Sequence, residues 1–403
     1  MLACVFVYVY NFIPKEFWPF SEQKNDSSLQ VEVIKNQDLS IHFLELGNKY
    51  TGDCTLIKTG DTEVLIDAGS KVDSILTIKN YLDQYVTDNK IEFVIVTHAH
   101  EDHYAGFATP EDTKSLFDWF NIETVIQFAK VTTSTQGNDI YTKYLRELSE
   151  LQDRCQTKVF TALDCIDETH GAQTKYKLND GIVLEILDQK YYREDTNDEN
   201  NNSVCCQIVQ NEKNYYLFTG DLEKSGEESL VKCNTLHEVV LYKAGHHGSK
   251  TSSNNALLEV IKPKIVCVCC CAGSTQYRAN PENRFPAQDF INRIAQYTEK
   301  VYVTTLFTFE WKRSIEMIEY AKTLVPINKI VVGGIASTLM PDEYEKATGI
   351  RPVTGLLNEP GKLGYPGDDT IDSITPDYTI LDDIASYYHY PYENAYFMYS
   401  TRG

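Results

Sequence analysis

From about Leu39 onward, short apolar runs alternate with polar turns in a pattern that predicts β-strands. The segment CTLIKTGDTEVLIDAGS contains two such runs around Thr59-Gly60-Asp61, which predicts a β-hairpin. LSIHFLELG before it and IEFVIVT after it predict two further strands. Later strand-like runs lie at residues 122–128, 181–187, 204–210, 214–219, 239–245, 265–271 and 300–305. The chain is therefore rich in short buried strands.

Helical spacing appears between these runs. Residues 71–86 place Ile75, Ile78, Leu82 and Val86 on one side of a predicted helix, and residues 141–151, 256–263 and 289–298 also have a helical pattern. Hairpins come first along the chain, and strands then alternate with helices. This order predicts an α+β fold in which helices cover the sheets.

Composition and length narrow the class of protein. The chain has 403 residues, 42% of them hydrophobic, which excludes a disordered chain. Its formal net charge of −21 excludes a protein that coats DNA through a basic surface. We therefore expect no stable nucleic-acid coat binding, but a substrate that meets the chain at one polar site is not excluded. The pattern divides the chain into an N-terminal segment (1–20), a linker (21–37), one large domain (38–305) and a tail (306–403).

The N-terminal segment permits two interpretations. MLACVFVYVYNFI is apolar and precedes a polar linker, as at the end of a truncated signal or membrane anchor, which would place the protein outside the cytoplasm and attached to a membrane. The same run is compatible with an apolar first strand. Most cysteines, for example Cys205, Cys206 and Cys267, lie inside strand-like runs and are predicted to be buried free thiols. Free thiols favour a reducing compartment, such as the cytoplasm.

Residues 98–103 are the strongest chemical signal. His98, His100, Asp102 and His103 follow directly after the predicted strand IEFVIVT. Three imidazoles and a carboxylate within six residues would be costly to bury without a shared partner. Neutral imidazole and carboxylate are ligands that suit Zn²⁺, with Mn²⁺ as an alternative. The sequence therefore predicts a metal site with one or two ions.

Other predicted strands also end in polar residues. Asp67 ends VLIDAGS, Asp221 ends YYLFTGD, and His246 and His247 end VVLYKAGHHGS. Strand ends of one sheet collect side chains from distant parts of a sequence. We expect these side chains to join the cluster at residues 98–103.

Together these motifs resemble the metallo-β-lactamase superfamily. HFLELG, GDCTLIKTG, VLIDAGS, the NNNS run, FTGD and KAGHHGSKTSS are most similar to the branch that includes the extracytoplasmic domain of the DNA-uptake channel ComEC and the phosphorylcholine esterases, over about residues 38–305. The resemblance implies an αββα sandwich with a binuclear metal site at one sheet edge.

The resemblance also implies roles for individual residues. His98 and His100 would bind the first metal, Asp102 and His103 the second, and Asp221 would bridge them. His246 is the preferred last ligand, because it is nearer the strand, and His247 would then contact the ligands or the substrate. Asp67 would orient a ligand histidine. Asp102, Asp67 and His247 are the candidate catalytic residues.

One departure from the superfamily pattern concerns the first metal. The usual histidine between the first cluster and the bridging aspartate is missing, and Glu199–Ser203 stands in its place. His170, which lies in this interval, is in a polar loop and is predicted to be solvated. Asn200, Asn202 or water could complete the first site.

The chemistry expected of such a site is hydrolysis by a metal-bound hydroxide. The branch resemblance favours a phosphodiester substrate, so that a phosphodiesterase or nuclease-type activity is the first hypothesis. An ester, thioester or lactone hydrolase and a non-catalytic metal-bound interaction module are the alternatives. Residues 248–252 would either present donors to a phosphate or form a simple exposed loop.

The tail reads as a different protein. Residues 306–403 resemble the N-terminal region of cobalamin-type radical SAM proteins, and the chain ends before any cluster cysteine. We expect a small partial α/β extension without chemistry of its own, either a fusion or an accessory domain.

Overall fold

The computed structural model describes residues 39–48, 50–272, 284–306, 345–346 and 348–351. The predicted anchor (1–20), the linker (21–37) and nearly all of the radical-SAM-like tail (306–403) lie outside the described residues. Those assignments, and the domain boundaries drawn from them, stay predictions.

The first sheet has six strands in the order in which they occur along the chain. They are β1 (Ser40–Phe43), β2 (Thr55–Thr59), β3 (Thr62–Ile66), β4 (Lys90–Val96), β5 (Asn121–Gln127) and β6 (Lys158–Thr161). β1, β2 and β3 are antiparallel, and β3 to β6 are parallel. The predicted hairpin is confirmed, with Gly60 in its turn at φ +58°, a conformation that glycine adopts without strain.

The second sheet has seven strands in the order β13-β12-β11-β10-β9-β8-β7. They are β7 (Lys175–Asn179), β8 (Ile182–Leu187), β9 (Cys205–Gln210), β10 (Asn214–Phe218), β11 (Leu241–Lys243), β12 (Ile265–Ala272) and β13 (Val301–Leu306). β7 to β10 are antiparallel, whereas β10, β11 and β12 run parallel. Each sheet therefore begins with hairpins and ends with parallel strands.

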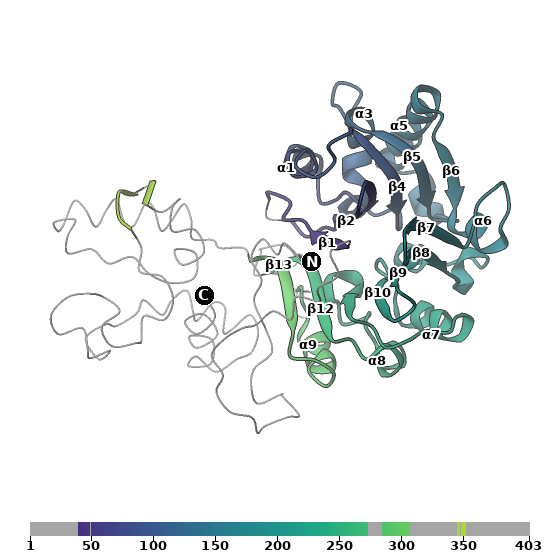
Figure 1. Cartoon of the computed structure of the whole chain (residues 1–403), viewed down its shortest axis with the longest axis vertical. Coiled ribbons are helices and arrows are strands. Elements are labelled where there is room, and N and C mark those ends of the chain that lie inside the picture. Colours follow the sequence, from purple (N-terminus) through teal and green to yellow (C-terminus); the bar gives the residue numbers. More distant parts are fainter. Residues whose placement is uncertain (1–38, 49, 273–283, 307–344, 347, 352–403) are drawn as a thin grey trace. The chain divides into compact units, whose positions relative to one another are not determined.

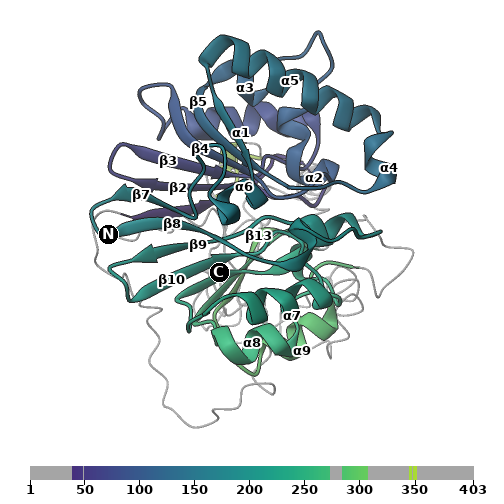
Figure 2. The same cartoon turned by 90° about the vertical axis from the view of Figure 1, so that its right-hand side faces the viewer.

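Helices cover the outer faces of both sheets, which confirms the αββα sandwich (Figures 1 and 2). α1 (Ile75–Leu82), α3 (Leu116–Trp119) and α5 (Asp139–Cys155) lie over the first sheet, and α7 (Lys224–Cys233), α8 (Asn255–Ile261) and α9 (Gln288–Ile294) lie over the second. Shorter helices form the connections: α2 (Glu101–Tyr104), α4 (Thr133–Gln136), α6 (Ala162–Asp167), η2 (Val72–Ser74), η3 (Ala105–Phe107), η4 (Lys190–Tyr192), η5 (Glu199–Asn202) and η6 (Gly245–Gly248).

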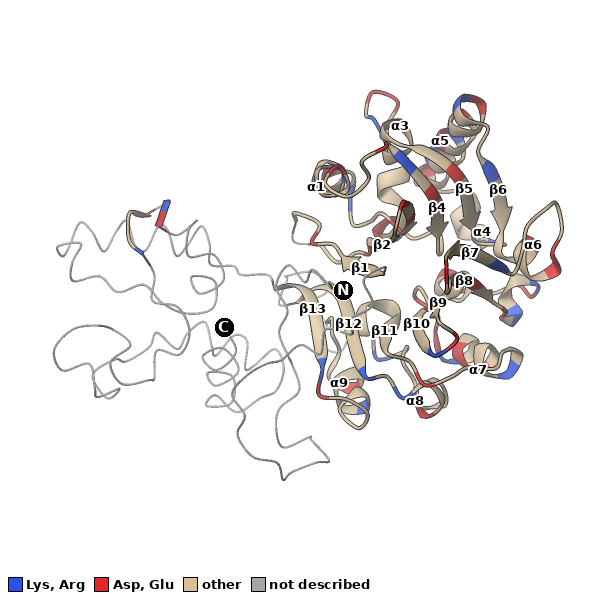
Figure 3. Cartoon of the chain, viewed as in Figure 1, with Lys and Arg blue, Asp and Glu red and all other residues tan. Residues whose placement is uncertain are grey.

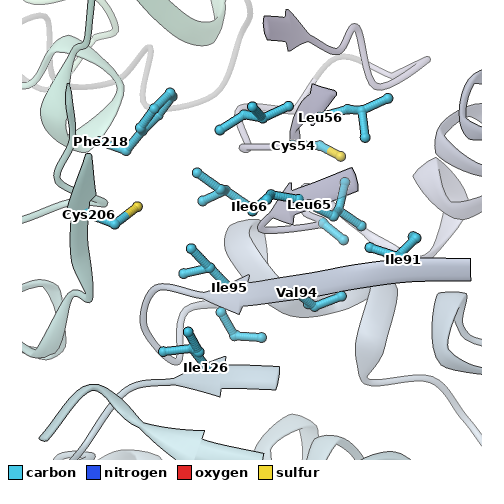
Figure 4. Packing of buried hydrophobic residues seen from close by; sticks show 14 of the residues in the cluster. Cys54, Leu56, Leu65, Ile66, Ile91, Val94, Ile95, Ile126, Cys206 and Phe218 are labelled. Carbon is cyan, nitrogen blue, oxygen red and sulfur yellow. The ribbon is translucent and has the colours of Figure 1, made fainter. Parts of the chain in front are cut away.

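The core lies between the sheets and beneath the helices. Figure 4 shows Ile66, Ile95 and Ile126 of the first sheet pointing toward Cys206 and Phe218 of the second. Their chain neighbours, Leu65 and Val94 among them, point to the opposite face, because side chains alternate along a strand. Both faces of the first sheet are therefore apolar, which explains the continuous hydrophobic runs of β4 and β5.

The cysteines support the sequence interpretation. Every cysteine that the structure describes is a free thiol, and Cys205, Cys206, Cys267, Cys269, Cys270 and Cys271 are buried. These side chains act as small hydrophobic residues in β9 and β12.

Several elements were not expected from the sequence, among them β6, β7 and α7. β6 and β7 are short and polar, because each is the last strand at one edge of its sheet. α7 contains Gly226 and many polar residues, so it has too few apolar residues at helical spacing to be predicted from the sequence. The predicted helix at 71–86 is shorter than expected, since α1 ends at Leu82, although Val86 is still buried.

Charged side chains lie mainly on the outer helices and connecting loops, with both signs interspersed (Figure 3). Among the described residues, none of the helices has the length and apolar character needed to cross a bilayer.

Phe218 tests the contact between the sheets. Its side chain is 2% exposed and its ring centroid lies 6.5 Å from that of Phe43. We expect Phe218→Ala to lower the free energy of unfolding by about 3–5 kcal/mol, because it leaves a cavity in the core. Urea denaturation measures this change.

Leu76→Ala is the matched control. Leu76 is 62% exposed on α1, so the change should stay within about 0.5 kcal/mol. Similar losses in both variants would contradict the packing described above.

Candidate metal centre

The candidate residues follow the ends of four strands and lie close together at one edge of the two sheets. Asp67 follows β3, His98 follows β4, Asp221 follows β10 and His247 follows β11. Because β3 and β4 are parallel, as are β10 and β11, each pair of strands ends at the same edge of its sheet. The loops after these strands therefore face one another across the two sheets.

Donor atoms from both sheets converge at this edge. Nε2 of His103 lies 3.3 Å from Nε2 of His247 and 3.2 Å from Oδ2 of Asp221. Nε2 of His247 lies 3.3 Å from Oδ2 of Asp221 and 3.3 Å from Oδ2 of Asp102. Two imidazole nitrogens and two carboxylate oxygens thus surround one small volume, with Asp102 and His103 from the first sheet and Asp221 and His247 from the second.

A second pair of imidazoles lies beside this group. Nε2 of His98 is 3.0 Å from Nδ1 of His100, and the His98 and His103 ring centroids are 4.2 Å apart. His98 is fully buried, and this burial, together with the neighbouring rings of His103 and His100, lowers its pKa well below the usual range. His98 is therefore a neutral imidazole, which is the form that binds metal.

Both ligand-like histidines are oriented by hydrogen bonds on their far side. Nδ1 of His103 donates to Oδ2 of Asp67 at 2.8 Å, and Asp67 also accepts from the backbone N–H and the hydroxyl of Thr97. Nδ1 of His247 donates to the carbonyl of Cys269 at 2.8 Å. Because these contacts occupy Nδ1, Nε2 is the nitrogen of each ring that faces the shared volume and would bind an ion there. Asp67 has the position expected of a residue that orients a histidine.

Asp53 and Lys243 were missed by the sequence interpretation. Asp53 belongs to a group of four buried residues, with His103, Asp221 and His247, that offer donor atoms within 4.8 Å of one another. However, its carboxylate approaches the Nδ1 atoms of the two histidines, at 3.6 Å and 3.3 Å, and not their Nε2 atoms. Asp102 faces Nε2 and is the better fourth donor. Lys243 forms a buried ion pair with Asp53.

His246 lies farther from the converging donors than His247. Its Nε2 is 4.0 Å from Oδ2 of Asp221, its side chain is 21% exposed, and its Nδ1 lies 3.4 Å from Oε1 of Glu223. His247 is 1% exposed and faces three donors. The geometry therefore favours His247 as the last ligand, whereas the sequence interpretation preferred His246. Both residues adopt positive φ and the chain turns back at this point, so the distance of each histidine from the strand does not decide which one faces the donors.

The electrostatics of the centre follow from burial of opposite charges. Burial alone would raise the pKa of Asp102 and Asp221, but the nearby His103 and His247 hold both values below the usual range. Burial alone would lower the pKa of His103, yet Asp221, Asp67 and Asp53 raise it well above the usual range. The positive and negative groups of the cluster therefore stabilise one another's charged forms.

The residues fit a divalent cation. Imidazole nitrogens with carboxylate oxygens form the ligand type that Zn²⁺ prefers. Oδ1 of Asp221 and the amide oxygens of Asn200 and Asn202 are buried and have no hydrogen-bond partner among the described residues. Such atoms are rare in proteins and are accounted for by an ion or water that the fold accommodates.

His170 is solvated, as the sequence suggested. Its side chain is 79% exposed and contacts Asp164 at 2.7 Å. It does not supply the missing histidine of the first metal.

The loop after His247 is fixed within the protein. The hydroxyl of Ser249 lies 2.9 Å from that of Thr251, which donates to Glu223, and the Ser252 hydroxyl donates to the Leu222 carbonyl. Arg293 on α9 donates to carbonyls of residues 250, 252 and 253 at 3.0 Å or less. The hydroxyls that the sequence offered to a phosphate are thus engaged internally.

Comparison with known families agrees with this geometry. The model of the metallo-beta-lactamase superfamily matches residues 47–109, which contain Asp53, Asp67 and the cluster at 98–103. The chain contains a metallo-β-lactamase domain. Proteins of this superfamily bind metal ions, and the centre described above is the potential metal site of this domain.

Two curated relatives support the resemblance to the ComEC-like branch. Recombination protein 2 of Haemophilus influenzae is 32% identical over 106 residues, 26% of this chain and 12% of that protein. ComE operon protein 3 of Bacillus subtilis is 30% identical over 93 residues, 22% of this chain and 12% of that protein. The metallo-β-lactamase domain therefore matches a small part of each relative.

Solved structures with similar folds include two further proteins. The metallo-beta-lactamase fold protein YhfI from Bacillus subtilis has a TM-score of 0.29 and 14% identity, with 48% of this chain and 64% of that chain covered. The short form of human tRNase Z has a TM-score of 0.30 and 11% identity, with 66% and 97% covered.

Asp221 and His170 provide a contrast for the ligand set. We expect Asp221→Ala to lower the bound metal to a small fraction of the wild-type content, because its carboxylate faces both Nε2 atoms. His170→Ala should leave the content unchanged. Mass spectrometry of the purified proteins for Zn²⁺ and Mn²⁺ measures both, and equal losses would show that the ligand set is misassigned.

The adjacent histidines provide a second test. His247→Ala should weaken Zn²⁺ binding by more than about 100-fold, whereas His246→Ala should weaken it by at most about 10–100-fold, the range for groups that contact ligands but not the ion. Competition with a chromophoric chelator gives both affinities. The reverse order would restore His246 as the ligand.

Proposed function

We propose that this domain is a metal-dependent hydrolase and that its substrate is a phosphodiester. The convergence of Asp102, His103, Asp221 and His247 from two sheets carries the proposal. A purely structural zinc site takes a closed set of ligands from Cys and His, often in one loop. Here carboxylates and imidazoles meet between sheets, with a second histidine pair beside them, which supports a catalytic site.

The proposed roles follow the positions of the side chains. Asp102, His103, Asp221 and His247 would hold one ion, and His98 and His100 would contribute to a second. A bound ion of this type lowers the pKa of water toward 7 and polarises the bond that is cleaved. Asp67 holds the proton on Nδ1 of His103, and the Cys269 carbonyl does the same for His247.

Asn200 and Asn202 are proposed to replace the missing histidine. They lie on η5, which joins the Asp221 loop because the Asp221 N–H donates to the Ser203 hydroxyl at 3.0 Å. The unpartnered amide oxygens of both residues support this role. An amide oxygen is a weaker ligand for Zn²⁺ than imidazole, so the first ion would be the more weakly bound.

A localised phosphodiester is a better substrate hypothesis than a long nucleic acid. Recombination protein 2, one of the relatives, has a name that refers to recombination, which is a reaction of phosphodiester-linked nucleic acid. This similarity supports phosphodiester chemistry over lactam chemistry. However, Glu223 and Asp198 lie near His246, and their charges would repel an extended polyanion.

The missing histidine favours a second candidate. If the first ion is absent, the domain would be a metal-bound interaction module that does not catalyse hydrolysis. An ester, thioester or lactone hydrolase with the same ligands is the remaining alternative.

A substrate panel separates these functions. We expect the Zn²⁺- or Mn²⁺-loaded protein to hydrolyse bis-p-nitrophenyl phosphate, with a much lower rate on a p-nitrophenyl ester and on a nitrocefin-type lactam. Chelation and Asp221→Ala should abolish the activity, since both remove the ion, and His170→Ala should not. Ester turnover alone would select the esterase hypothesis. Stable metal binding without turnover on any of these substrates would support the interaction module.

A further inference from the structure

Asp53 and Lys243 form an ion pair that crosses from one sheet to the other. Asp53 lies in the loop before β2 of the first sheet, and Lys243 is the last residue of β11 in the second. The side chain of each is 4% exposed. Nζ of Lys243 also lies 3.7 Å from Oδ1 of Asp221 and 3.5 Å from the Gly220 carbonyl. The pair therefore joins the two halves of the structure directly beside the converging donors.

Asp53 also contacts the donor residues of both sheets. Its carboxylate lies 3.3 Å from Nδ1 of His247 and 3.6 Å from Nδ1 of His103, on the sides of the rings that face away from Asp221. Its backbone N–H donates to the Asp102 carbonyl at 3.0 Å, and its carbonyl accepts from Gly69 N–H at 2.8 Å. One residue thus contacts Asp102, His103 and His247.

Stability alone does not explain such a pair. Removing two charges from water is costly, and replacing a buried ion pair by apolar residues is often neutral or stabilising. Buried apolar residues already lie on either side of Lys243 in the chain, namely Tyr242 in β11 and Ala244 directly after it. The position beside the donors suggests a different role. Lys243 places a cation next to Asp221, and Asp53 places an anion behind the imidazoles of His103 and His247, so the pair restricts the orientations of these side chains.

We propose that the Asp53–Lys243 pair positions the metal centre, holding the Asp102/His103 half and the Asp221/His247 half at the separation that one divalent ion requires. The Lys243 cation lies 3.7 Å from Oδ1 of Asp221 and attracts that end of the carboxylate, while Oδ2 faces the two Nε2 atoms. Asp53 restrains the His103 and His247 rings from behind. Both are positioning residues and touch neither substrate nor ion. This inference rests on the proposed metal centre.

The test removes both charges at once. Lys243→Met alone would remove the lysine that neutralises the buried Asp53 carboxylate, and the loss of one member of a buried ion pair is strongly destabilising. The double variant Asp53→Asn/Lys243→Met keeps the volumes similar and leaves no uncompensated charge. We expect it to fold with near wild-type resistance to urea and to bind Zn²⁺ about 10–100-fold more weakly, as is typical when residues that orient ligands are lost. Competition with a chromophoric chelator measures the affinity, and the visible absorption of bound Co²⁺ reports a changed ligand geometry.

A second ion pair, with a buried carboxylate and a partly exposed lysine, supplies the control. Lys58 and Glu63 pair within the β2–β3 hairpin and contact none of the donor residues in the described contacts. Lys58→Met/Glu63→Gln should leave the Zn²⁺ affinity and the Co²⁺ spectrum unchanged. If the first double variant does not fold, Asp53→Asn alone is used, and the same loss of affinity is expected.

The outcomes separate this inference from the metal centre itself. Wild-type affinity and spectrum in the Asp53 variants would overturn the positioning role while leaving the centre intact. Equal losses in the control pair would also overturn it, since the effect would then be general. A wild-type protein that binds neither Zn²⁺ nor Co²⁺ would overturn the proposed metal centre and this inference with it.

Discussion

Buried carboxylates where the two sheets meet impose the strongest constraint on this molecule. Asp53, Asp67 and Asp221 are each at most 3% exposed, although the core between the sheets is built of apolar side chains (Figure 4). A buried charge is tolerated only with a partner and hydrogen bonds. The partners of these carboxylates, chiefly His103 and Lys243, come from different strand ends. The loops after β3, β4, β10 and β11 must therefore meet at one point, and the rest of the sandwich keeps them there.

The backbone of these loops is strained in consequence. Asp67, His246 and His247 all have φ between +46° and +59°, a region that costs roughly 1 kcal/mol or more for a residue with a Cβ. At Gly69 the loops come so close that a Cβ would lie 1.6 Å from the Asp102 carbonyl oxygen, so only glycine fits. Strain persists where surrounding contacts fix the geometry, and here the hydrogen bonds of Asp67 and His247 do so. This cost is consistent with a site selected for the placement of its side chains.

Local pattern was enough to predict most of the fold and the approximate site. Alternation and spacing gave the strands on either side of Thr59-Gly60-Asp61, and strand-terminal polar residues gave Asp67 and Asp221. Two features escaped it for physical reasons. Asp53 lies in the motif GDCTLIKTG, but its contacts with the centre depend on Lys243. In the sequence, Lys243 has the pattern of an ordinary strand residue, and only the packing of the two sheets brings it to Asp53. The choice between His246 and His247 depends on two positive φ angles, which leave no signature in the spacing of the histidines.

The same arrangement predicts that two ions would be held unequally. The site at His103 and His247 has two carboxylates and two imidazoles oriented by Asp67 and the Cys269 carbonyl, so little freedom is lost when an ion binds. The site at His98 and His100 has imidazoles that face each other at 3.0 Å, but it lacks a third histidine and depends on amide oxygens. An ion at His98 and His100 could reach Asp221 only through Oδ1. Lys243 lies beside this oxygen, and its positive charge would repel the ion. The charge that would stabilise an ion at His103 and His247 would therefore weaken binding of an ion at His98 and His100. The number of ions bound would then depend on electrostatics as well as on the missing histidine.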